Sequence, residues 1–141
     1  MKPVEGTIVI MDLDNFSEVI KERGWSEWRP NDATALLTEL VRSFASKWGG
    51  AVIWGLDEER GTEEAVIEIP YVEPEELKED LENIRRRLAE LGVSISIVAV
   101  KDYVFPKEED RRRAYWSTPG RRRAKKLLEK LKRSGGGLLI T

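Results

Sequence analysis

TIVIMDLDNF, residues 7–16, is the most informative stretch of the sequence. The apolar run that begins at Ile8 is too short to span a membrane and is typical of a central strand covered on both faces. The chain turns after such a strand, so Asp12 and Asp14 are expected at the carboxyl edge of a sheet, where α/β proteins bind ligands. Two carboxylates so close together repel each other, which favours a bound cation such as Mg²⁺. The alternative is that Asp12 caps a turn and Asp14 caps the helix that starts near Phe16.

The composition limits the chemistry that this chain can perform. The 141 residues include neither cysteine nor histidine, which excludes disulfides, thiolate zinc sites and Ser-His-Asp or Cys-His catalysis. The remaining carboxylate, amine, guanidinium and hydroxyl groups favour hard cations over transition metals. We expect one domain, residues 1–141. With no signal-peptide pattern and no apolar span, we expect a soluble cytoplasmic protein without a membrane partner. The charged fraction of 35 % is typical of a thermophile's surface.

Charge is distributed unevenly along the chain. Residues 101–141 hold 13 of the 24 Lys and Arg residues but only five of the 26 acidic ones. This asymmetry fits a phosphate-bearing ligand bridged between a metal on the acidic part and cations on the basic part, and it fits equally a well-solvated terminal helix. The arginine triplets 111–113 and 121–123 enclose Tyr115 and Trp116, a composition found on nucleic-acid surfaces. The overall acidity argues against a dedicated nucleic-acid binder.

The rest of the chain alternates apolar patterns with clear start and stop signals. We expect helices at 17–24, from the start signal 29–32 to the glycine pair 49–50, from Pro74 to Gly92, and from Thr118 to the glycine triplet 135–137. Strands are expected at 51–54 and 65–69, paired as a hairpin, and at 93–100 and 138–140. No structure is predicted for 101–116. The order βααββαβαβ indicates an α+β fold, palm-like or ferredoxin-like, whose antiparallel-containing sheet carries packed helices.

Two segments resemble the metal-binding landmarks of the nucleotide-cyclase and polymerase palm superfamily, which includes GGDEF domains, palm polymerases of the CRISPR type and archaeal type III GTP cyclohydrolase. The first is DLDNF, residues 12–16, at a strand end; the second is WGLDE, residues 54–58, in the hairpin. The second departs from the GGDEF pattern, since Leu56 replaces a glycine and Glu59 a phenylalanine. The long first helix and the start signal 117–119 are most similar to the cyclohydrolase. That enzyme has two such domains, so a shared activity would require a homodimer here.

The resemblance implies a role for particular residues. Metal ions would be held by Asp12, the backbone carbonyl of Leu13 and Asp57, with Asp12 and Asp57 meeting across neighbouring strands. Asp14 completes the expected catalytic set. Because like charges raise a neighbouring pKa, one of the three carboxylates is expected to remain protonated and to act as a base.

Phosphate groups would be bound by three further positions. The superfamily contacts phosphate at three positions that correspond here to the backbone amides of Asn15 and Phe16 and to the side chain of Lys132. The arginine that the superfamily places nearby is Gly136 in this chain.

The sequence therefore predicts an enzyme that depends on Mg²⁺ or Mn²⁺ and processes a nucleoside triphosphate, GTP first, in the manner of a cyclohydrolase or a nucleotidyl cyclase. The resemblance to an archaeal enzyme and the charged surface together suggest an archaeal thermophile. The alternative is an inactive nucleotide-binding or dimerisation module of the same fold, because a fold alone implies no function.

Overall fold

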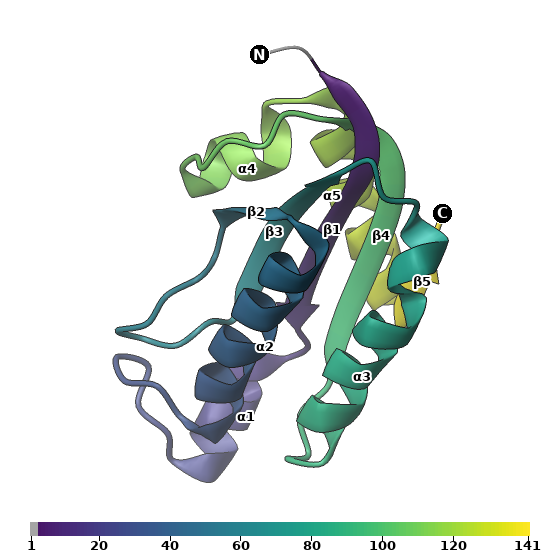
Figure 1. The fold of residues 1–141 in the computed structure, drawn as a ribbon. Coiled ribbons are helices and arrows are strands. Elements are labelled where there is room, and N and C mark those ends of the chain that lie inside the picture. The colour runs from purple at the N-terminus through teal and green to yellow at the C-terminus, as the bar shows by residue number, and fades with distance from the viewer. Residues whose placement is uncertain (1–2) are drawn as a thin grey trace.

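A single five-stranded sheet forms the centre of the protein (Figure 1). The computed structural model describes residues 3–141. The strands are β1 (Val4–Leu13), β2 (Ala51–Trp54), β3 (Glu64–Pro70), β4 (Ile95–Val104) and β5 (Leu138–Ile140), and they lie in the order β2-β3-β1-β4-β5. All neighbours are antiparallel except β4 and β5, which are parallel. The expected palm-like or ferredoxin-like α+β fold is confirmed.

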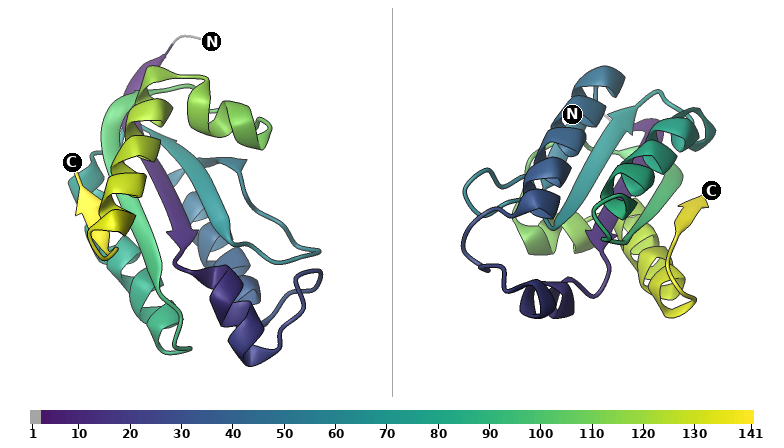
Figure 2. Two further views of the ribbon diagram at one scale, coloured as in Figure 1. Left: turned by 180° about the vertical axis from the view of Figure 1, so that it is seen from behind. Right: turned by 90° about the horizontal axis from the view of Figure 1, so that it is seen from below.

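Helices cover both faces of the sheet (Figures 1 and 2). Helices α2 (Asp32–Trp48) and α3 (Lys78–Ala89) pack on one face, and the 3₁₀ turn η1 (Pro74–Leu77) leads into α3. Helices α4 (Arg111–Trp116) and α5 (Pro119–Arg133) lie on the opposite face. The short helix α1 (Phe16–Arg23) follows β1 directly. No helix among residues 3–141 is long and apolar enough to cross a membrane.

Strand β1 is buried on both sides because it is the central strand. Val9, Met11 and Leu13 enter the core beneath α2 and α3, whereas Ile8 and Ile10 enter the core beneath α4 and α5. Side chains alternate along a strand, so the side chain of Asp12 belongs to the α4 and α5 face. The prediction of a central strand covered on both faces, made from the apolar run that begins at Ile8, is thus confirmed.

The helix boundaries follow from local capping chemistry. Asn31 and Thr34 form a reciprocal capping box at the start of α2, and Asp110 and Thr118 accept backbone hydrogen bonds at the starts of α4 and α5. Asn15 precedes α1 with φ 49°, a left-handed conformation that asparagine tolerates better than most residues. This residue lets the chain turn sharply from the end of β1 into α1.

The structure extends the expected elements where strand pairing continues. β1 pairs with β4 from Val4 opposite Val104 to Leu13 opposite Ile95, so both strands are longer than the local patterns indicate. β4 spans Ile95–Val104, so it begins later and ends later than the predicted strand 93–100. The charged segment 101–116, for which no structure was predicted, contains the end of β4 and helix α4.

Candidate functional site

A cavity of about 600 Å³ opens beside Asp12 at the carboxyl end of β1. Its walls come from β2, the loop 55–63, the start of β3 and the segment that leads into α4. Carboxylates dominate the lining, with six acidic residues against two arginines; the charged members are Asp12, Asp57, Glu63, Glu64, Glu108, Glu109, Arg60 and Arg111. So concentrated a negative charge favours a ligand that carries a cation.

One ammonium group lies between two of the carboxylates that the sequence singled out, Asp12 and Asp14. The Nζ atom of Lys132 lies 3.3 Å from Oδ2 of Asp12 and 3.2 Å from Oδ1 of Asp14. It also donates a hydrogen bond of 3.1 Å to the backbone carbonyl of Leu13. The ammonium group of Lys132 therefore contacts two of the expected metal ligands, the carboxylate of Asp12 and the carbonyl of Leu13.

Asp14 is bound by two serines at the start of β4. The hydroxyls of Ser94 and Ser96 each donate a hydrogen bond of 2.7 Å to its two carboxylate oxygens, and its backbone N–H donates to the carbonyl of Ser94. With Lys132, these contacts engage both carboxylate oxygens of Asp14. Asp14 is thus tied to serines that lie 80 and 82 residues away along the chain.

Asp12 has a different environment. Its side chain lines the cavity, and Lys132 is the one ion-pair partner that residues 3–141 provide for it. Burial raises the pKa of Asp12 above its ordinary value, and the nearby charge of Glu64 raises it further, while Lys132 opposes both effects. Of the two carboxylates, Asp12 is the one that lines the cavity, where a ligand can meet it.

Glu64 is a site residue that the sequence reasoning missed. It is the register partner of Asp12 on β3, and it pairs with Arg111 through bonds of 2.5 and 3.3 Å. The indole of Trp54 donates a further hydrogen bond of 3.1 Å to it. Burial alone would raise the pKa of Glu64, but Arg111 and Trp54 lower it overall. The signal available in the sequence was an acid at the start of the apolar strand 65–69.

Asp57 lies in the loop that joins β2 to β3. Of these two strands only β3 is a neighbour of β1, because β3 lies between β1 and β2; the meeting of Asp12 and Asp57 at one ion stays a prediction. Oδ1 of Asp57 accepts hydrogen bonds of 3.0 and 2.9 Å from the backbone amides of Glu59 and Arg60. Asp57 does line the cavity, but one of its oxygens shapes the loop.

The loop 55–63 is fastened to α2 by buried hydroxyls. Oγ1 of Thr62 lies 2.7 Å from Oγ1 of Thr38 and accepts a bond of 3.2 Å from the amide of Asp57. The amide of Thr62 donates to the carbonyl of Thr34. The loop is consequently a fixed wall of the cavity.

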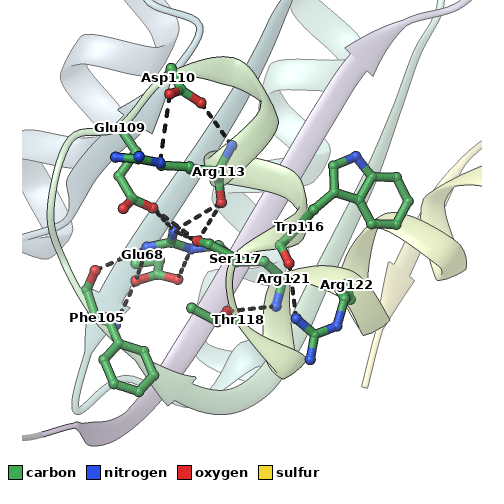
Figure 3. A network of polar contacts seen from close by, with 10 residues as sticks. All are labelled: Glu68, Phe105, Glu109, Asp110, Arg113, Trp116, Ser117, Thr118, Arg121 and Arg122. Atoms are coloured by element: carbon green, nitrogen blue, oxygen red, sulfur yellow. Dashed lines mark hydrogen bonds and ion pairs between the residues drawn. The ribbon is translucent and has the colours of Figure 1, made fainter.

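The opposite wall depends on a buried arginine (Figure 3). Arg121 of α5 donates two hydrogen bonds, of 2.7 and 3.2 Å, to the carboxylate of Glu68 on β3. It also binds the carboxylate of Glu109 and the carbonyl of Phe105. Arg121 is 1 % exposed and Glu68 is 0 % exposed. These contacts hold the segment that carries Glu109 and Arg111 beside the edge strand β2, where the amide of Glu109 donates a hydrogen bond to the carbonyl of Ile53.

Tyr115 lies beneath this segment instead of on a nucleic-acid surface. It is buried, and its hydroxyl has no hydrogen-bond partner within residues 3–141. Burial and the negative charges of Glu64 and Asp12 raise the pKa of this phenol well above its usual range. Trp116, its neighbour in the sequence, is exposed.

The absence of an arginine at position 136 has a steric reason. Gly136 adopts φ 81°, and a Cβ atom there would lie 2.8 Å from Oγ of Ser96 and 3.1 Å from Oδ2 of Asp14. A side chain at this position would disrupt the Asp14 contacts. The glycine triplet turns the chain from α5 into β5, and its middle residue packs closely against Ser96 and Asp14.

The described residues, 3–141, contain no group of three or more acidic, histidine or cysteine side chains placed to hold a metal ion.

Neither a family model nor a curated protein matches the sequence. Among solved structures, a guanylyl cyclase aligns with 79 % of this chain at 13 % identity and a TM-score of 0.41. The chain covers 61 % of that structure.

Proposed function

We propose that this chain binds a nucleoside triphosphate with Mg²⁺ in the cavity beside Asp12 and processes it as cyclohydrolases or nucleotidyl cyclases do. The observation that supports this most directly is the convergence of oxygens from Asp12, Leu13 and Asp14 on one cation at the carboxyl end of the central strand. The adjoining cavity, about 600 Å³, falls within the usual size of small-molecule sites, roughly 300–1,000 Å³.

The donor atoms suit a hard divalent cation. Carboxylate and carbonyl oxygens are the protein ligands that Mg²⁺ prefers, and they already surround a positive group here. In this proposal Asp12 and the carbonyl of Leu13 hold the ion, and Asp57 approaches it from the loop. A bound Mg²⁺ would neutralise charge on the phosphates.

Phosphate recognition is assigned to the start of α1 and to Lys132. The first amide groups of a helix have no partner within that helix and carry partial positive charge. Here those amides belong to Asn15 and Phe16, directly after the carboxylates. GTP is the first candidate because the sequence resembles that of a GTP cyclohydrolase.

Asp12 is assigned to the metal ion. Its side chain lines the cavity, and a bound Mg²⁺ would hold it as the carboxylate although burial raises its pKa above the ordinary value. Asp14 positions Lys132 and the end of β1, because its own oxygens are engaged by Ser94 and Ser96.

Calorimetry with GTP and ATP, each with Mg²⁺, tests the proposal on wild type, on Asp12→Asn and on Glu22→Gln. Glu22 is exposed on α1 and controls for the loss of one negative charge. We expect wild type and Glu22→Gln to bind a triphosphate equally and to release a product detectable by chromatography. Asp12→Asn should bind at least tenfold more weakly. Absence of nucleotide binding by wild type, or equal binding by all three proteins, would contradict the proposal.

An inactive module of the same fold is the second candidate. The use of Asp57 as a turn former favours it, since this acid is then retained for the loop without any chemistry. Nucleotide binding without product would support this reading. Light scattering at increasing protein concentration would test the homodimer that the resemblance implies.

A further inference from the structure

Lys132 lies where the candidate metal ion would bind. Its ammonium group has three hydrogens to donate, and three oxygens lie within 3.3 Å of it, from Asp12, Leu13 and Asp14. The ammonium therefore satisfies the same acceptors that would otherwise hold a divalent ion.

The backbone fixes the base of this side chain. Lys132 belongs to the last turn of α5, and the glycine turn 135–137 carries the chain back along β4 into β5. The amide of Gly137 lies 3.4 Å from Oγ of Ser96, so the turn is tied to the serine that also binds Asp14. The lysine side chain, in contrast, has four flexible carbon atoms and can relocate without moving the helix.

A metal ion and this ammonium cannot occupy the cluster together. Mg²⁺ requires oxygen ligands at about 2.0–2.1 Å in near-octahedral order. A second cation on the same oxygens would lie only a few ångströms away, inside a half-buried site where like charges repel strongly. Metal binding to Asp12 and Leu13 thus requires the ammonium to leave both.

We propose that Lys132 is the resident counter-ion of this site, and that a divalent cation binds only by displacing its ammonium from Asp12 and Leu13. Lys132 then sets the metal affinity of the cluster. The inference rests on the metal site of the proposed function but on no particular nucleotide or reaction. Asp14 keeps its two serine hydrogen bonds after displacement, so the cluster retains its shape.

Titration of Mn²⁺ alone, followed by calorimetry, tests this inference on wild type, Lys132→Met, Lys132→Gln and Lys130→Met. Lys130 is exposed on the same helix, so its replacement removes the same charge without touching the cluster. The glutamine variant keeps a donor for the carbonyl of Leu13 and serves if the methionine variant folds poorly, as judged by circular dichroism. Both Lys132 variants should bind Mn²⁺ at least tenfold more tightly than Lys130→Met.

Thermal melting supplies a second measurement. Without metal, Lys132→Met should melt below Lys130→Met because Asp12 and Asp14 lose their counter-ion, and Mn²⁺ should reverse the order. Equal or weaker Mn²⁺ affinity in the Lys132 variants, or no Mn²⁺ binding by any protein, would overturn the inference. Tighter binding in these variants would uphold it even if no nucleotide binds to wild type, a result that would contradict only the proposed function.

Discussion

Replacement of Arg121 by methionine should be among the most destabilising single changes in this protein. The guanidinium is 1 % exposed and binds Glu68, which is 0 % exposed, along with Glu109 and the carbonyl of Phe105. Removing one partner of a buried ion pair leaves an uncompensated charge and costs about 3–5 kcal/mol. For a chain of this length, about 3 °C per kcal/mol gives a melting temperature lower by roughly 9–15 °C.

The assay is urea unfolding followed by circular dichroism, with Arg122→Met as the control. Arg122 is the next residue of the same helix and is exposed, and within residues 3–141 its side chain makes one hydrogen bond, to the carbonyl of Trp116. Its replacement should change the free energy of unfolding by less than about 0.5 kcal/mol. The double variant Arg121→Met with Glu68→Leu should recover at least about 1 kcal/mol, because it removes the fully buried carboxylate that Arg121→Met alone leaves unpaired. A loss below about 1 kcal/mol in Arg121→Met would refute the reasoning.

Three further predictions concern residues around the cavity. Asp57→Ala should lower the free energy of unfolding by about 1 kcal/mol because the loop amides lose their acceptor, and Asp57→Asn, which keeps an oxygen, should lose less than half as much in the same urea titration. Tyr115→Phe should leave the melting temperature unchanged or raise it, because the hydroxyl that it removes is buried without a partner; a fall of more than about 3 °C would reveal a hydrogen bond. Arg111→Met should lower the melting temperature at pH 7, and its difference from wild type should shrink as the pH falls below 4.5. The native pKa of Glu64 is lowered from 4.5, so the pair stabilises the fold above that pH and loses this contribution as Glu64 is protonated. A difference that is constant from pH 7 to pH 3 would exclude the ion pair as its source.

The elements of the fold could be predicted because each depends on residues close together in the chain. The apolar run at Ile8, the start signals at Asn31 and Thr118 and the glycine stops act locally, and the helices and strands appear where they indicate. The carboxylates Asp12 and Asp14 were likewise recognisable at the end of a strand.

The partners of these carboxylates could not be read from the chain. Lys132 lies more than a hundred residues from Leu13, whose carbonyl it binds, and Glu64 faces Asp12 only through the register of β1 and β3. Glu68 was a visible anomaly, an acid inside the apolar strand 65–69, but several arginines near the C-terminus could have been its partner. A buried charge requires a counter-charge, and that requirement is local. Which residue meets it depends on strand order and helix placement, because the energy of an ion pair depends on distance in space and not on separation along the sequence.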